Sequence, residues 1–377
     1  MDRLISMGRV VEGLWDQLRA GVKHRMEWMG PVEILPYRGH GTSRTLFLKG
    51  RVLVGKGITR SNENDTVITN VRNMIRRFAS DEIPFARVRA RFEGRELETR
   101  ADKEGFFDLR FDLDAAPETS PEVSPGGASN VASETSTGWH PVEIELTWPY
   151  RKGDETRATG YVLVPSGPRF GVISDLDDTV VRTSVRSLLK MLKLVLLSNA
   201  HARLPFEGVA AFYQALQQSG GREFNPIFYV SNGPWNLYDL MEDFLDVHGL
   251  PAGPLFLRDW SATTVRRSNE HKLGIIRTLL ETYPQLQFIL IGDSGEKDPE
   301  IYHRIVLEHP GRISKIYIRD VSNRERANDI HFIAREVASS GVEMLLVPDT
   351  AAAAEHAARE GLIPPSTLPQ VRQADAP

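Results

Sequence analysis

Residues 171–183 read GVISDLDDTVVRT, a short apolar stretch followed by three aspartates and a threonine within five positions. The apolar part is typical of a buried strand, and the aspartates come where that strand should end. Asp175 and Asp177 stand two residues apart, so their carboxylates would repel each other if they converged on one point. A hard cation that prefers oxygen ligands, such as Mg²⁺, relieves that repulsion. The stretch therefore predicts a strand that ends in a cation site.

Similar apolar stretches recur after residue 169, with helix-like segments between most of them. They read FGVISD, PIFYVS, PLFL, QFILIGD, ISKIYI and EMLLVP. Buried strands that alternate with helices predict a parallel sheet covered on both faces, that is, an α/β fold with a doubly wound sheet over residues 169–362. Ligands of such sheets bind beyond the carboxyl ends of the strands, so we expect the site there.

Polar residues follow the other apolar stretches at this same edge. Ser231 and Asn232 end one stretch, Asp293 ends another, and Asp298 comes five residues later. Lys272 opens the predicted helix before the Asp293 strand. Carboxylates, a hydroxyl and an ammonium are thus predicted at neighbouring strand ends.

Such a set of side chains suits phosphoryl transfer. A carboxylate can attack phosphorus only when a metal ion and cationic or hydrogen-bonding groups screen the approaching anions. Mg²⁺, Lys272 and the Ser231 hydroxyl meet that demand. A second carboxyl, at Asp177, can protonate the departing alkoxide and later activate water.

Four pieces of sequence, in this order and spacing, resemble the motifs of the haloacid dehalogenase superfamily: DLDDT, YVSN, Lys272 and GDSGEKD. The resemblance implies that Asp175 is the nucleophile and Asp177 the general acid and base. It implies phosphate binding by Ser231, Asn232, Lys272 and Thr179, and Mg²⁺ binding by Asp175, Asp177 (through its backbone carbonyl), Asp293 and Asp298. The dehalogenase branch lacks the second aspartate of DLDDT, so its presence here favours phosphoryl transfer.

Longer strings resemble the catalytic domain of the actin-patch phosphatidate phosphatase family, whose bacterial members also carry an N-terminal β domain. The strings are SDLDDTVVRTSV, YVSNGPWNLYDLMEDFL, KLGIIRTLLETYP and FILIGDSGEKDPEIY, with PYRGHGTSRTLFLKGRVL and TRADKEGFFDL resembling the β domain. The resemblance implies a phosphoric monoester hydrolase that converts phosphatidate to diacylglycerol through an aspartyl phosphate. A soluble phosphomonoester is the alternative substrate. A membrane- or protein-binding module on a phosphatase-like platform is the alternative function, although the four retained motifs argue against it.

Residues 31–168 form short stretches in which apolar and polar side chains alternate, typical of an antiparallel β-sandwich. In FARVRARFEG (85–94), three arginines fall on one strand face. They suit a phosphate-binding strip, but the solvated face of a sheet is the favoured interpretation. Residues 115–138 and 363–377 are rich in Pro, Ser and other small or polar residues, which predicts a disordered loop and a disordered tail.

Two further stretches have an apolar helical face. Residues 1–30 predict an amphipathic helix, for which docking on protein is favoured over a membrane surface. Leucines within SLLKMLKLVLLSNAHARLPFEG (187–208) suit either a bilayer contact or packing over the catalytic domain. Trp235 is placed equally well at the substrate entrance or in packing.

The whole chain has 377 residues, a formal net charge of -4 and no cysteine. It therefore lacks the basic surface charge of a nucleic-acid binder and any thiolate chemistry. No apolar run reaches the roughly 18 residues of a membrane span, and no signal peptide is evident. We expect a cytoplasmic protein, with peripheral membrane contact if its substrate is a lipid.

Overall fold

The computed structural model describes residues 31–54, 82–113, 138–149, 156–176, 204–219, 224–258, 268–321 and 324–374. Several predictions lie outside these residues: the helix over 1–30, all but the last residue of the loop 115–138, and the apolar insertion up to residue 203. Asp177 and Thr179 also lie outside them.

The N-terminal part is a single hydrogen-bonded sheet of eight strands. They are β1 (Val32–Pro36), β2 (Gly39–Gly41), β3 (Thr45–Val54), β4 (Arg87–Phe92), β5 (Arg95–Arg100), β6 (Phe106–Asp112), β7 (Trp139–Trp148) and β8 (Arg157–Leu163). The order is β1-β3-β2-β8-β7-β4-β5, with β6 paired to β3. The predicted alternation is confirmed in β4, where Val88, Ala90 and Phe92 are buried in one apolar cluster.

A second sheet has six strands, and its neighbouring strands all pair in parallel. They are β9 (Gly171–Asp175), β10 (Ile227–Pro234), β11 (Leu255–Arg258), β12 (Phe288–Asp293), β13 (Ile313–Arg319) and β14 (Glu343–Val347). The order is β11-β10-β9-β12-β13-β14, so the order of strands reverses between β9 and β12. The six predicted apolar stretches are these strands, which confirms the parallel sheet. The crevice beyond β9 and β12 is where such sheets bind ligands.

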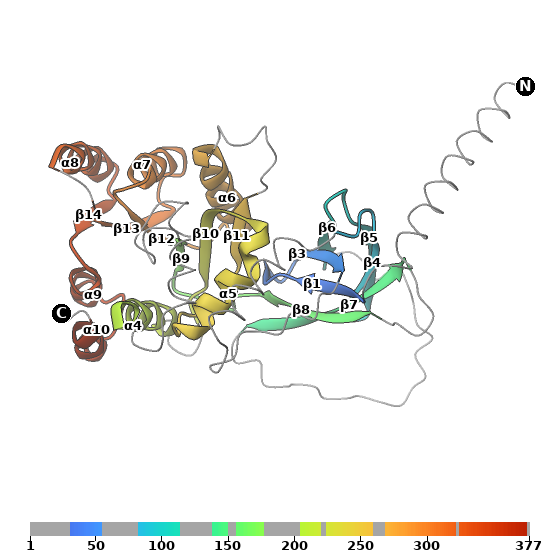
Figure 1. The fold of residues 1–377 in the computed structure, drawn as a ribbon. Helices are drawn as coiled ribbons and strands as arrows, with labels where there is room; N and C mark the ends of the chain where they lie inside the picture. Colours follow the sequence, from blue (N-terminus) through green and yellow to red (C-terminus); the bar gives the residue numbers. More distant parts are fainter. Residues whose placement is uncertain are drawn as a thin grey trace, which may run out of the picture.

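Helices cover both faces of the parallel sheet (Figure 1). On one face lie α6 (Ser268–Thr282), α7 (Asp298–Glu308) and α8 (Arg324–Ser339). On the other lie α4 (Leu204–Gln218), α5 (Tyr238–Val247), α9 (Thr350–Arg359) and α10 (Leu368–Ala374). The side chains of successive strand residues point to opposite faces of the sheet. In β12, Ile289 and Ile291 belong to the apolar cluster on one face and Leu290 to the cluster on the other. Within the described residues, no helix is long and apolar enough to cross a membrane.

The prediction of a disordered tail is wrong for residues 363–374. Ile363 is buried, a 3-10 turn η3 (Pro365–Thr367) follows, and α10 packs against α4. Val371 is fully buried in the same apolar cluster, with Leu368 packed against it one turn earlier. Two apolar side chains at helical spacing thus order a segment whose overall composition is polar.

The N-terminal sheet is joined to the parallel sheet on the side of β11 and α5 (Figure 1). Tyr37 and Phe106 belong to the apolar cluster that α4 and α5 also form. The Tyr37 ring stacks on Trp235, with 4.9 Å between centroids. The N-terminal sheet therefore rests on the chain that leaves β10.

Candidate active site

Asp175 is the last residue of β9, a strand flanked on both sides by parallel neighbours. Asp175 is 1% exposed, and it lies opposite Val230 where β9 pairs with β10. The backbone N–H of Leu176 donates to the Val230 carbonyl at 3.0 Å. Ser231 and Asn232 therefore follow directly beyond Asp175 at the same edge, as predicted from the strand ends.

Lys272, in the first turns of α6, brings the carboxylates together. Its Nζ lies 2.8 Å from Asp175 Oδ1, 2.5 Å from Asp298 Oδ1 and 3.3 Å from Glu296 Oε2. Burial alone would lower the pKa of Lys272, but the charges of Asp175 and Asp298 outweigh burial and raise that pKa well above its usual value. The ammonium therefore stays charged at neutral pH and offsets part of the surrounding negative charge.

Asp298 and Asp293 accept hydrogen bonds from backbone N–H groups at the end of β12 and in the loop before α7. The Asp293 N–H donates to Asp298 Oδ2 at 3.2 Å. Asp293 Oδ1 accepts from the N–H groups of Gly295 and Glu296 at 2.6 and 3.0 Å. Burial raises the pKa of Asp298 to about 6, although the neighbouring ammonium opposes this rise. These contacts hold Asp298, at the start of α7, next to Asp293 at the end of β12.

Asp175, Asp293 and Asp298 form a group suited to a metal ion. One carboxylate oxygen from each lies within 4.8 Å of the others, and all three residues are buried. Three buried carboxylates repel one another, and the single charge of Lys272 does not balance them. A divalent cation that takes oxygen ligands fits this donor set.

The side chains of Asn232 and Lys272 contact the same oxygen of Glu296. Asn232 Nδ2 donates to Glu296 Oε2 at 3.1 Å, the same oxygen that Lys272 contacts. Ser231 is buried, and its Oγ accepts from the Gly233 N–H at 2.9 Å, so it shapes the last part of β10. Of the predicted phosphate-binding residues, Asn232 and Lys272 are thus brought together.

Glu296 and Arg326 shape the site and were not predicted. Arg326 on α8 donates to the carbonyls of Ser294 and Glu296 at 3.2 and 2.8 Å. It also pairs with Glu300 of α7 at 2.7 Å. Glu296 lies inside GDSGEKD, where an additional carboxylate could have been noticed. No local pattern marks Arg326, because its contacts arise only when α8 packs beside α7.

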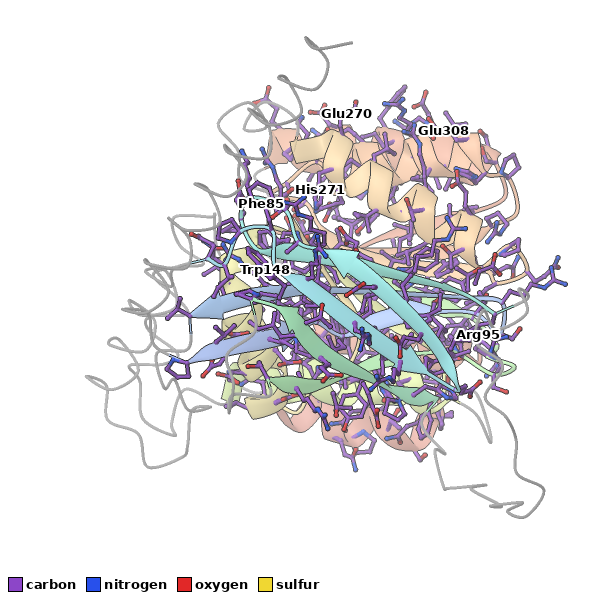
Figure 2. The ribbon with its side chains drawn as sticks, turned by 90° about the vertical axis from the view of Figure 1, so that its right-hand side faces the viewer. Phe85, Arg95, Trp148, Glu270, His271 and Glu308 are labelled. Carbon is purple, nitrogen blue, oxygen red and sulfur yellow. The ribbon has the colours of Figure 1, made fainter. Side chains whose placement is uncertain are left out.

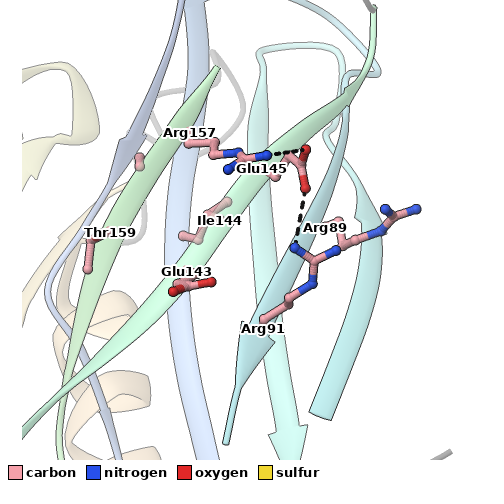
Figure 3. Close-up of a pocket in the computed structure, with 8 residues that line it drawn as sticks. Arg89, Arg91, Glu143, Ile144, Glu145, Arg157 and Thr159 are labelled. Carbon is pink, nitrogen blue, oxygen red and sulfur yellow. Dashed lines mark ion pairs between the residues drawn. The ribbon is translucent and has the colours of Figure 1, made fainter. Parts of the chain in front are cut away.

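The arginines of β4 do not form a separate cationic strip. They lie on the side of β4 opposite its buried residues Val88, Ala90 and Phe92. Figure 2 shows the strands of the N-terminal sheet in front of the helices of the parallel sheet. In a hollow of about 310 Å³ (Figure 3), Arg91 and Arg157 both pair with Glu145, at 3.5 and 3.6 Å. Arg89 and Arg91 also pair with Glu96. This mixture of charges favours a solvated sheet face over a phosphate-binding strip.

Residues 170–320 match the family described as phosphatidate phosphatase APP1, catalytic domain. The match runs from β9 to the end of β13 and so contains Asp175, Lys272, Asp293 and Asp298. The predicted resemblance to the actin-patch phosphatidate phosphatase family is confirmed for this segment.

Two curated relatives match part of this chain. Phosphatidate phosphatase APP1 of Saccharomyces cerevisiae is 35% identical over 199 residues, which are 52% of this chain and 31% of APP1. An uncharacterized protein of Schizosaccharomyces pombe is 28% identical over 155 residues, which are 40% of this chain and 25% of that protein. The matched segment thus spans less than a third of either relative.

Among solved structures, a carbohydrate acetylesterase from Xanthomonas citri aligns over 80% of this chain and 73% of its own. It is 13% identical with a TM-score of 0.26, a likeness too low to bear on fold or function.

Proposed function

We propose that this protein is a Mg²⁺-dependent phosphatase that hydrolyses phosphatidate to diacylglycerol and inorganic phosphate through an aspartyl phosphate at Asp175. One observation carries the proposal: Lys272 joins Asp175 and Asp298 in a buried centre at the carboxyl edge of the parallel sheet. That centre lies inside the segment that matches the APP1 catalytic domain.

Asp175, Asp293 and Asp298 would hold the metal ion, together with the Asp177 carbonyl that the family resemblance implies. When bound, Mg²⁺ screens the negative charge of the phosphate and of the aspartates. The ammonium of Lys272 and the amide of Asn232 would bind phosphoryl oxygens, because both donors already converge on the Glu296 carboxylate.

The reaction then has two displacements. An oxygen of Asp175 attacks phosphorus while the bond from phosphorus to the glycerol oxygen breaks, and Asp177 gives its proton to the leaving alkoxide. Asp177 next accepts a proton from water, whose oxygen attacks the phosphorus of the aspartyl phosphate. Inorganic phosphate leaves and the Asp175 carboxylate is regenerated.

The proposal of phosphatidate as substrate rests on the yeast relative, which is named a phosphatidate phosphatase. The apolar stretch over 187–208, which follows the Asp175 motif, is compatible with it, because its leucines suit contact with a lipid surface as well as packing over the catalytic domain. A soluble phosphomonoester would use the same centre.

The test is phosphate release from phosphatidate vesicles, glycerol 3-phosphate and p-nitrophenyl phosphate, each with Mg²⁺ and with EDTA. We expect release from the vesicles that EDTA abolishes and that Asp175→Asn lowers by at least about 10³-fold. Glu281→Gln, an amide change at an exposed carboxylate on α6, should leave release unchanged. Full release by Asp175→Asn would refute the mechanism, whereas preference for a soluble ester would refute only the lipid assignment.

A further inference from the structure

Ser231 and Asn232 lie in the last part of β10, and the segment from Ser231 to Leu237 is held at both of its ends. At the first end, β10 pairs with β9 up to Val230. At the second end, the 3-10 turn η2 (Trp235–Leu237) lies against the N-terminal sheet, and Leu237 is buried. Pro234 also pairs with Arg258 of β11, so Asn232 lies between contacts that belong to different parts of the fold.

Arg51 of β3 provides the polar half of the contacts at the second end. Its Nη1 donates to Asn236 Oδ1 at 2.7 Å. Its Nε donates to the Glu104 carbonyl and its Nη2 to Glu82, both at 2.9 Å. The guanidinium lies 4.4 Å from the ring centroid of Phe106, and the residue is only 4% exposed. Because all three nitrogens of the Arg51 guanidinium have an acceptor, the guanidinium that binds Asn236 has a fixed orientation.

Aromatic rings provide the other half. Tyr37 stacks on Trp235 with an interplanar angle of 13°, and its ring centroid is 4.1 Å from that of Tyr238. Lys49 Nζ lies 5.5 Å from the Trp235 ring centroid. Trp235 thus packs on the N-terminal sheet, and the turn that follows Asn232 cannot shift without breaking these contacts.

We propose that Arg51 is a positioning residue for phosphate binding: through Asn236 it makes the N-terminal sheet part of the catalytic apparatus. The inference deepens the proposed function and rests on it. Asn232 and Lys272 converge on one oxygen of Glu296, so both donors must be correctly placed to share a phosphate. A displacement of about 1 Å in such a site can cost about 10²-fold in rate.

Arg38 is a natural control because it crosses the same junction and the ion pairs of its side chain go to α5. Its Nε pairs with Glu242 at 3.0 Å and its Nη2 with Asp246 at 3.1 Å, both on α5. Loss of the Arg38 side chain should weaken the junction, whereas loss of Arg51 should also move the residues that bind phosphate.

The first test measures kcat and KM for phosphate release with Mg²⁺ in matched variants. Arg51→Gln and Asn236→Ala should each lower kcat/KM by about 10- to 100-fold, and the double variant should be no worse than either alone. Asn236→Asp retains an acceptor for the guanidinium and should stay near wild type. Arg38→Gln should lower the melting temperature with kcat within about twofold. Additive losses, or an equal loss in Arg38→Gln, would overturn the proposal.

A second test does not depend on turnover. Amide hydrogen exchange of the full-length protein should be faster in Arg51→Gln over residues 231–237 and unchanged over residues 288–293 of β12. Unchanged exchange over 231–237 would overturn the inference even in an active enzyme. A wild-type protein that releases no phosphate, yet shows the faster exchange, would refute the proposed function while leaving the role of Arg51 in holding the turn.

Discussion

Close packing around Lys272 makes the candidate site sensitive to single atoms. Gly292 of β12 shows this most clearly, because a Cβ at that position would lie 2.3 Å from Asp298 Oδ2 and 2.8 Å from its Cβ. The backbone of β12 can approach Asp298 only because residue 292 has no side chain. The Asp298 carboxylate is then free to meet both Lys272 and the Asp293 N–H.

We expect Gly292→Ala to lower phosphate release by about 10²-fold and to destabilise the fold by about 1 to 3 kcal/mol through overpacking. The measurement is kcat together with urea unfolding. Gly274→Ala on α6 is the control, since a Cβ there meets nothing within 4 Å. That change should keep activity and add about 0.5 to 1 kcal/mol of stability. Equal activity in the two variants would contradict the packing argument.

The residues that meet at the site were predictable to different degrees. Asp175, Lys272, Asp293 and Asp298 stand in or beside strand and helix ends that periodicity reveals, and parallel strands bring such ends to one edge. The contact of Arg51 with Asn236 joins residues 185 positions apart, and nothing local to either residue signals it. Contacts between separate elements require the tertiary fold, which is why supporting residues escaped prediction.

At the scale of elements, the β12–α7 loop is held by α8 from outside the site. Burial alone would raise the pKa of Glu300, but hydrogen bonds from Arg326 and Lys297 lower it to about 2. The Arg326–Glu300 pair is therefore ionised throughout the physiological range. It ties α7 to α8 while Arg326 also holds the carbonyls of Ser294 and Glu296.

Arg326→Gln should lower Mg²⁺ affinity by about 10- to 100-fold, as expected for groups that orient metal ligands. The measurement is the Mg²⁺ concentration that gives half-maximal phosphate release and half of the thermal shift. Arg277→Gln is the matched control: it removes a bidentate pair with Glu308 between α6 and α7, at 2.6 and 2.8 Å, away from this loop. A similar change in both variants, or in neither, would show that Arg326 does not position the ligands.

Helices and strands were predicted correctly where their apolar pattern is long, and the prediction failed where the pattern is short. The central strands β9, β10 and β12 are buried along almost all of their length and carry long apolar stretches. By contrast, α10 spans Leu368–Ala374, and among its residues 368–372, whose burial the structure describes, only Val371 is buried. A pattern of two apolar residues in a Pro- and Gln-containing segment is too weak to distinguish a docked helix from a loop.

On the scale of the whole molecule, the two sheets share a buried junction and should not unfold independently. His40 of β2 lies in that junction, with its ring near Phe228 and Phe256 and its Nδ1 3.4 Å from the Tyr283 hydroxyl. Burial lowers the pKa of His40 from 6.5 to about 4. Its neutral form is therefore the one compatible with the docked sheets.

Acidification should consequently weaken the junction. Because the pKa of His40 is lower in the folded than in the unfolded protein, the unfolded state binds more protons between pH 6.5 and 4, and stability falls as pH decreases. The His40 contribution amounts to a loss of about 2 kcal/mol between pH 7 and pH 5. Urea unfolding at both pH values should show a change in stability that is less favourable in wild type than in His40→Phe by about this amount. His331→Gln, at an exposed site on α8, should behave as wild type, and an undiminished pH dependence in His40→Phe would place the titrating group elsewhere.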